Sequence, residues 1–240
     1  MPTARSGQID VYYEVHGVLV RAEPAVLIMG LGADHTAWGG LVPALARHRR
    51  VLVLDNRGCG RSARPPGPYS TAEMAADVVA ALDDAGIARA HVVGLSLGGM
   101  IAQEMALGHA RRVRSLVLVA TAARADAALA EAAAQSVPAG PEEDRQGLRG
   151  QVEALLAHDT VARLSTIGAP TLVVLATADP LVAPALSRAL ARGIPRSLLR
   201  EIAPGSHALH RDRAGELAAL LEEWLAGLWW QRRSEPVGDG

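Results

Sequence analysis

The chain has 240 residues, of which 50% are hydrophobic and 20% are charged, and its formal net charge is −1. This charge balance excludes an electrostatic nucleic-acid binder, which would carry a surplus of basic residues. No apolar run reaches the roughly 18 residues that a membrane span needs. All 24 basic residues are Arg, so enzymes that depend on a Lys amine, such as Schiff-base enzymes and P-loop nucleotidases, are excluded too. The single cysteine, Cys59, excludes an internal disulfide and a thiolate zinc cage.

Short aliphatic runs alternate with longer amphipathic stretches along the chain. The expected strands are 9–15, 25–29, 51–54, 91–93, 113–119, 171–175 and 197–202, and the expected helices are 38–47, 71–85, 97–107, 184–191 and 215–230. Several of the strand runs are apolar without alternation, which is typical of strands that are covered on both faces. The pattern predicts an α/β fold with a mostly parallel, doubly wound sheet and crossover helices.

The stretch 124–167 interrupts this alternation, because it contains no convincing strand. Two Ala- and Leu-rich helical patterns flank the turn-rich sequence SVPAGPEED there. We interpret the stretch as a small helical lid, which divides the chain into core halves at 1–123 and 168–233, the lid at 124–167 and a flexible tail at 234–240. The helical faces of the lid carry small side chains that bury little apolar surface, so we expect the lid to dock weakly.

The strongest local motif is Gly94-Leu95-Ser96-Leu97-Gly98, which lies between an expected strand and an expected helix. Small flanking residues allow the tight turn that exposes a Ser hydroxyl and directs helix N–H groups toward a substrate carbonyl. Ser96 is therefore the candidate nucleophile. The alternative is an ordinary Gly-rich turn, and the two interpretations differ in whether a base and a carboxylate accompany the serine.

Two downstream residues supply that base and carboxylate. Asp179 follows the apolar strand at 171–175, and His207 lies in a loop after the next strand. The order Ser, Asp, His is the one that the elbow motif predicts, and the carboxyl ends of parallel strands can bring such residues together. The histidine would take the serine proton, and the carboxylate would orient the histidine. His210 is a competing base, and Asp126 is a competing carboxylate.

With these motifs, the chain resembles the α/β-hydrolase family over nearly its whole length. VLIMGLGADHTAW resembles the family's oxyanion loop, and LDNRGCGRS resembles its D-x-R-G-x-G-x-S turn. The stretch from GPYSTAEM to GLSLGGM is most similar to the branch of enol-lactonases, small-ester hydrolases and cofactor-free haloperoxidases. The resemblance implies that the backbone N–H groups of Leu31 and Leu97 form the oxyanion hole. Met29, Ala176 and Ser206 stand where many relatives have His, Gly and Gly.

We therefore expect a cofactor-independent serine hydrolase that cleaves a carboxylic ester or a lactone through an acyl-enzyme. Two alternatives stay open. The same triad could carry out acyl transfer, perhydrolysis or cyclisation of a biosynthetic intermediate, or the chain could be an inactive ligand-binding relic. Residues 58–63 also match a dinucleotide-binding motif, but the prolines at 65, 66 and 68 exclude the helix that such a motif needs.

The remaining expectations concern partners and location. The histidines are scattered and no motif holds a cofactor, so we expect neither a metal ion nor a cofactor. The first ten residues have no apolar stretch, which favours a cytoplasmic protein, and the Ala- and Arg-rich composition is typical of GC-rich bacterial coding. Trp229 and Trp230, on the last expected helix, are candidate contacts for a homodimer.

Overall fold

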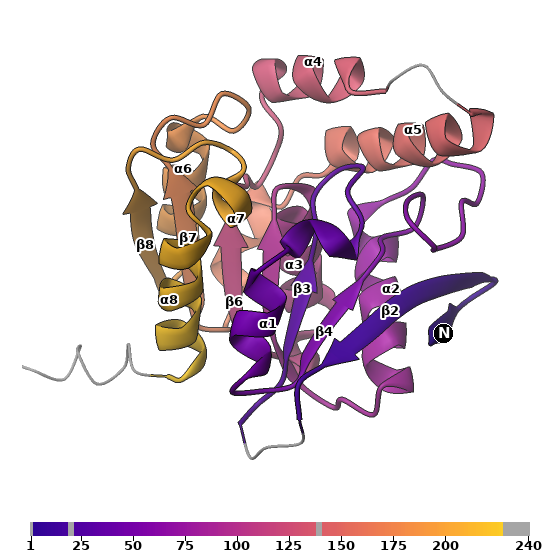
Figure 1. The fold of residues 1–240 in the computed structure, drawn as a ribbon. Coiled ribbons are helices and arrows are strands. Elements are labelled where there is room, and N and C mark those ends of the chain that lie inside the picture. Colours follow the sequence, from indigo (N-terminus) through magenta and orange to yellow (C-terminus); the bar gives the residue numbers. More distant parts are fainter. Residues whose placement is uncertain (1, 19–21, 138–140, 228–240) are drawn as a thin grey trace, which may run out of the picture.

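One sheet of eight strands runs through the centre of the molecule (Figure 1). The strands span Thr3–Ser6 (β1), Ile9–His16 (β2), Ala25–Ile28 (β3), Val51–Leu54 (β4), Ala90–Leu95 (β5), Val113–Val119 (β6), Thr171–Ala176 (β7) and Ser197–Ile202 (β8). Their order is β1-β2-β4-β3-β5-β6-β7-β8; β2 pairs antiparallel with β1 and β4, and every pair from β4 to β8 is parallel. The computed structural model describes residues 2–18, 22–137 and 141–227.

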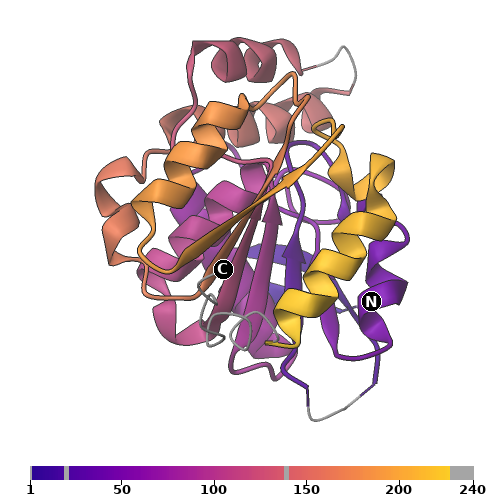
Figure 2. The ribbon, with the colours of Figure 1, turned by 90° about the vertical axis from the view of Figure 1, so that its left-hand side faces the viewer.

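Helices cover both faces of this sheet (Figure 2). They span Leu41–Ala46 (α1), Thr71–Asp84 (α2), Leu97–Gly108 (α3), Ala127–Gln135 (α4), Glu142–Ala157 (α5), Pro184–Gly193 (α6), Leu209–Asp212 (α7) and Ala214–Leu225 (α8), with 3₁₀ turns at His35–Trp38 (η1), Ala110–Arg112 (η2) and Val161–Thr166 (η3). Successive strand residues point to opposite faces. Val26 and Ile28 therefore belong to the core on the side of α2, α3 and α6, and Ala25 and Leu27 belong to the core on the side of α1, α7 and α8.

The predicted doubly wound, mostly parallel sheet is confirmed, and three differences have local causes. β1 was not predicted, because in its four residues only Ala4 is buried and the hydrophobic pattern is too short to recognise. The helix expected at 38–47 is divided into η1 and α1, since Gly39 adopts a φ of 50° that breaks the helical path. In place of the helix expected at 215–230, α8 ends at Leu225. Residues 228–230, which include Trp229 and Trp230, lie outside the described ranges.

Helices α4 and α5, which belong to the stretch 124–167, lie over the carboxyl ends of the central strands and form the top of the molecule (Figure 1). An isolated antiparallel bridge joins Arg124, at the start of the stretch, to Asp159, just after α5. The division of the chain at residues 123 and 167 stays a prediction. Among the helices of the described ranges, none combines the length and the apolarity needed to cross a membrane.

The two lid helices dock differently. On α4 only Leu129 and Ala133 are buried, which fits the weak docking expected from small side chains. On α5 two glycines allow much closer contact: a Cβ at Gly147 would lie 2.1 Å from the carbonyl oxygen of Gly58, and a Cβ at Gly150 would lie 2.5 Å from the ring of Tyr69. The helix backbone therefore rests directly on the neighbouring loop, and the expectation of weak docking does not apply to α5.

Candidate active site

Ser96 occupies the turn between β5 and α3, with a φ of 55°. For a residue other than Gly this left-handed conformation is strained, and it persists only where the surroundings enforce it. Those surroundings are tight: a Cβ at Gly94 would lie 2.2 Å from the carbonyl oxygen of Gly98, and a Cβ at Gly98 would lie 2.0 Å from that of Ile28. Thr121 Oγ1 donates a 2.7 Å hydrogen bond to the carbonyl oxygen of Ser96 and holds the turn from the loop after β6. Only glycine fits at positions 94 and 98, two residues before and two residues after this serine.

His207 and Asp179 meet at the carboxyl ends of β7 and β8. His207 Nδ1 lies 2.8 Å from Asp179 Oδ2, and the other carboxylate oxygen accepts hydrogen bonds from the backbone N–H groups of Leu181 and Val182 at 2.8 and 2.9 Å. The Asp179 side chain is almost fully buried. A carboxylate can only accept hydrogen bonds, so Nδ1 of His207 carries the proton of this contact and Nε2 is left as the basic atom.

Residues 29–36, which we call the oxyanion loop after the role predicted for it, pass beside the serine. A Cβ at Gly30 would lie only 3.2 Å from Ser96 Cβ, so the backbone just before Leu31 is in contact with the predicted nucleophile. Leu97 is the first residue of α3, and its N–H is one of the four at a helix start that have no acceptor within the helix. The two residues predicted to supply the oxyanion hole thus come from backbone segments on either side of Ser96.

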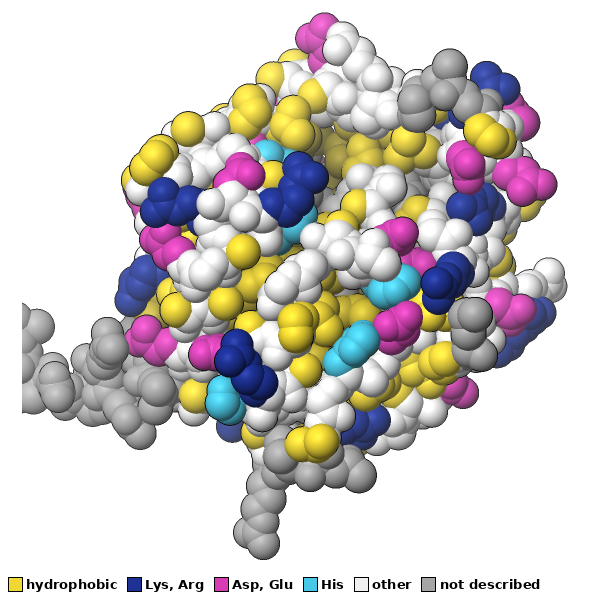
Figure 3. Space-filling model, viewed as in Figure 1, with side chains coloured by type: hydrophobic (Ala, Val, Ile, Leu, Met, Phe, Trp, Pro, Cys, Tyr) yellow, Lys and Arg dark blue, Asp and Glu magenta, His cyan; other side chains and the backbone are white. Residues whose placement is uncertain are grey.

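A cavity of about 460 Å³ brings these elements together. Ser96, His207 and Leu31 line it, and α4 and α5 contribute Leu129 and Leu155 from above. Figure 3 shows a hollow beneath α4 with hydrophobic side chains at its floor. The apolar wall is built from Met, Leu, Ala and Pro: Met29, Leu31, Ala33, Ala37, Leu95, Leu129, Ala132, Ala133, Leu155, Pro180, Leu181 and Ala208.

The two competing residues have other surroundings. His210 lines the cavity, but its ring packs edge-on against Trp38 with centroids 6.1 Å apart, and burial, Arg211 and His207 lower its pKa. Asp126 caps the start of α4 by accepting a 2.9 Å hydrogen bond from the N–H of Leu129. The carboxylate paired with a histidine at this site is therefore Asp179.

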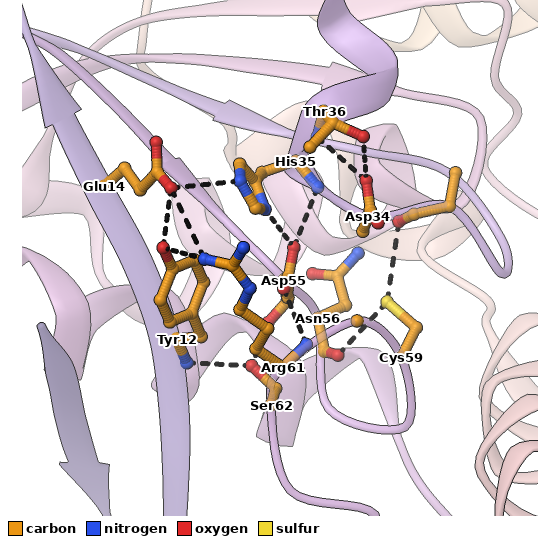
Figure 4. A network of polar contacts seen from close by, with 12 residues as sticks. Tyr12, Glu14, Asp34, His35, Thr36, Asp55, Asn56, Cys59, Arg61 and Ser62 are labelled. Carbon is orange, nitrogen blue, oxygen red and sulfur yellow. Dashed lines mark hydrogen bonds and ion pairs between the residues drawn. The ribbon is translucent and has the colours of Figure 1, made fainter. Parts of the chain in front are cut away.

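The turn that follows β4 holds the oxyanion loop from below (Figure 4). Asp55 is fully buried, and its Oδ1 accepts hydrogen bonds from both the backbone N–H and the Nδ1 of His35, at 2.8 and 2.7 Å. Its Oδ2 accepts the N–H of Arg61 at 2.8 Å, and the side chain of Asn56 donates to the carbonyl oxygen of Met29 at 2.9 Å. The D-x-R-G-x-G-x-S turn thus fixes both ends of the oxyanion loop, a role that the motif alone did not indicate.

Within the described residues, one group of side chains could offer three ligand atoms to a metal ion: Asp34, His35 and Asp55, with those atoms within 4.8 Å of one another. The hydrogen bonds of Asp55 occupy both of its oxygens, and Asp34 Oδ1 accepts from the N–H and the hydroxyl of Thr36. The group is therefore satisfied as a loop support. On its outer side, Glu14 and His35 line a second hollow of about 620 Å³ that contains none of the predicted triad residues.

Sequence reasoning missed two polar residues of the cavity wall, Ser136 and Arg211. Ser136 follows α4, and Arg211 lies on the short helix α7, next to His210. Neither belongs to a motif, and only the way the lid and the loop after β8 fold back over Ser96 brings them to the site. The departure from the family at Ser206 has a local explanation, because its hydroxyl bonds to Asp212 and accepts the N–H of Ala208, which stabilises the start of α7.

A parallel sheet with helices on both faces, a serine on a strained strand–helix turn and a His–Asp pair at neighbouring strand ends define the architecture of a hydrolase. The model of the alpha/beta hydrolase fold matches residues 24–166, which is more than half of the chain. This protein belongs to the alpha/beta hydrolase family.

Relatives and solved structures agree with this assignment. A protein of Azorhizobium caulinodans, named as a candidate carbamate hydrolase, RutD, is 36% identical, with 87% of this chain and 92% of that protein covered. The enol-lactonase of Burkholderia xenovorans LB400 superposes with a TM-score of 0.85 at 28% identity, covering 94% of this chain and 100% of that one. A hydrolase of Pseudomonas aeruginosa PA01 gives 0.79 at 31% identity, with 90% and 95% covered.

Proposed function

We propose that the protein is a cofactor-independent serine hydrolase that cleaves an ester or a lactone through an acyl-enzyme. The observation that carries the proposal is the meeting of two arrangements in one cavity. Ser96 stands on a strained turn, and His207, bonded at Nδ1 to buried Asp179, lines the same 460 Å³ space. An inactive relic has no evident reason to keep both the strain at Ser96 and the burial of the Asp179 carboxylate, each of which costs folding free energy.

The mechanism follows from these positions. Ser96 Oγ attacks the acyl carbon while Nε2 of His207 takes the hydroxyl proton, and Asp179 stabilises the imidazolium that forms. The N–H groups of Leu31 and Leu97 donate to the oxygen that becomes negatively charged. The imidazolium then gives its proton to the leaving alkoxide. Water, deprotonated by His207, attacks the acyl-enzyme, and the collapse of the second intermediate releases the acid and restores Ser96.

The substrate class is supported by the wall of the cavity and by the relatives. Most residues of the cavity wall are apolar, and Ser136 and Arg211 are among the few polar ones. Such a wall suits an acyl or alcohol group of moderate size. The similarity to an enol-lactonase favours a lactone, and the 36% identity to a protein named as a candidate carbamate hydrolase makes a carbamate the second candidate. Both substrates pass through the same attack on an acyl carbon. Acyl transfer or perhydrolysis would require another acceptor to replace water at the acyl-enzyme.

The deciding experiment compares the wild-type protein with Ser96→Ala on a panel of matched esters, lactones and carbamates. We expect turnover of at least one ester or lactone, with a loss on the order of 10⁴-fold or more in Ser96→Ala. A fluorophosphonate should label Ser96 in the wild type, and mass spectrometry should locate the adduct. Activity should survive dialysis against EDTA. Turnover that is unchanged in Ser96→Ala, or that is lost with EDTA, would refute the mechanism.

A further inference from the structure

We propose that Gln151, on lid helix α5, is a positioning residue for the oxyanion loop. The inference rests on the proposed function, because it assigns the lid a part in the chemistry at Ser96. Gln151 lies 119 positions after Gly32 in the chain, and no motif of the sequence includes it. Its side chain reaches across from the lid to the residue that directly follows Leu31, one of the two predicted oxyanion donors.

The amide of Gln151 joins three segments. Its Oε1 accepts the N–H of Gly32 at 2.8 Å, and its Nε2 donates to the carbonyl oxygen of Arg57 at 2.8 Å. Gly32 belongs to the oxyanion loop, Arg57 belongs to the turn after β4, and Gln151 belongs to the lid. The two contacts require opposite polarity, so the amide has one orientation that satisfies both, and a flipped amide satisfies neither.

Burial makes these two hydrogen bonds important. The Gln151 side chain is fully buried, with 0% of its surface exposed. An apolar side chain in its place would remove the partner of the Gly32 N–H and of the Arg57 carbonyl oxygen. Gly32 is exposed and Arg57 is half-buried, so both backbone groups can reach water, but only if the loop moves away from the buried apolar side chain. Because the peptide unit that contains the N–H of Gly32 also contains the carbonyl of Leu31, such a movement turns the predicted oxyanion donor next to it.

The helix that carries Gln151 is itself held in place. Gly147 lies one turn before Gln151 on the same face of α5, and Gly150 directly precedes Gln151 in the chain. The two glycines bring the helix backbone against Gly58 and Tyr69. A Cβ at Gly32, whose φ is 69°, would lie 3.1 Å from the side chain of Leu148, so the loop and the helix are in direct contact as well. The Gln151 amide is thus presented from a rigid position.

The other supports of the loop act at different points. Asn56 holds Met29 at one end, and Asp55 holds His35 at the other (Figure 4). Between these two supports, the hydrogen bond from Gly32 to Gln151 connects the central part of the loop to the lid. The geometry therefore predicts that the loss of Gln151 leaves the ends of the loop in place and allows its centre, beside Leu31, to shift.

The test uses the Gln151→Met substitution, which keeps the length and removes both hydrogen bonds, in the full-length protein. The matched control is Val152→Ala, a buried position on the same helix that makes neither hydrogen bond. We expect kcat to fall about 10- to 100-fold in Gln151→Met, because a shift of about 1 Å at a catalytic group has an effect of this size. KM should stay within about twofold, and inhibition by a boronic acid or a trifluoromethyl ketone should weaken by the same factor as kcat.

Two further measurements keep the test decisive. Gln151→Glu retains an acceptor for the N–H of Gly32, so it should recover part of the lost kcat, and it replaces Gln151→Met if that variant does not fold. Hydrogen exchange of a peptide that covers residues 29–36 should be faster in Gln151→Met than in Val152→Ala. Equal kcat in Gln151→Met and the wild type, or equal losses in Gln151→Met and Val152→Ala, would overturn the proposal. Failure of the serine mechanism itself is recognised separately, from activity that persists in Ser96→Ala.

Discussion

Replacing Gly147 by Ala on lid helix α5 tests whether close backbone contact holds the lid in place. Two effects oppose each other. Ala favours a helix over Gly by about 0.5–1 kcal/mol, which should stabilise the protein. The added Cβ, however, would lie 2.1 Å from the carbonyl oxygen of Gly58, and this neighbour is backbone that cannot rotate away. Overpacking of this kind costs about 1–3 kcal/mol, and occasionally more.

The steric effect should win. For the Cβ to reach an ordinary contact distance, α5 must move by roughly 1 Å away from the turn, which stretches the two hydrogen bonds of Gln151 and removes about 0.5–1.5 kcal/mol for each. Combined with the overpacking, these losses exceed the gain in helix propensity by about 3 kcal/mol at the middle of each range. In a protein of this size, that difference lowers Tm by roughly 6–12 °C.

The control is the same substitution where there is space. Gly215 lies in α8, and a Cβ there would meet no atom within 4 Å, so Gly215→Ala should raise Tm slightly through helix propensity alone. Both variants can be compared with the wild type by thermal unfolding followed by circular dichroism. If Gly147→Ala is as stable as Gly215→Ala, the lid is not held by close backbone contact, and the argument about α5 fails.

Three further predictions concern single side chains. His207→Ala should lower kcat by about 10⁴-fold, whereas His210→Ala should keep kcat within about threefold; the opposite result in initial-rate assays would move the base to His210. Burial lowers the pKa of His91 to about 3, so its contribution to stability is complete above pH 6.5 and decreases by about 1.4 kcal/mol per pH unit as the pH falls toward 3; urea unfolding at pH 7 and 5 should show this, with a smaller difference in His91→Leu. Burial also raises the pKa of the Cys59 thiol to about 12, so DTNB should react with it only in the unfolded protein, and rapid reaction in the native state would show that the turn after β4 opens.

Much of the fold could be predicted from the sequence because its central strands have a simple pattern. β3 and β4 are buried at every position, and four consecutive apolar residues are enough to recognise such a strand when helical patterns stand on either side. β1 lacks this pattern, because it is an edge strand with one buried side chain. Its pairing with β2 depends on the register of a hairpin, and no hydrophobic periodicity records that register.

The candidate site was predictable to the extent that its chemistry lies in short motifs. Ser96 stands between a strand and a helix that are both evident in the sequence, and the order of Ser96, Asp179 and His207 along the chain follows the order of parallel strands. Gln151 had no comparable signal, because a glutamine in an amphipathic helix pattern is usually exposed to solvent. Its burial depends on the path by which α5 crosses the turn after β4, which is a property of the tertiary structure.

The lid shows why counting apolar side chains underestimated the docking of α5. Apolar area measures only one way in which a helix can be held, and small side chains offer little of it. Glycines at 147 and 150 act differently, because the absence of a Cβ brings the backbone of α5 within van der Waals contact of Gly58 and Tyr69, where a buried amide such as Gln151 can join two other segments. On α4, in contrast, Leu129 and Ala133 alone are buried, and the same helix lines the cavity with Ala132. The two helices are thus held differently: α5 is fixed to the oxyanion loop and to the turn after β4 and cannot change without disturbing them, whereas α4 covers the cavity with few constraints. Differences in substrate size among relatives of this architecture should therefore arise from α4 and its flanking residues rather than from α5.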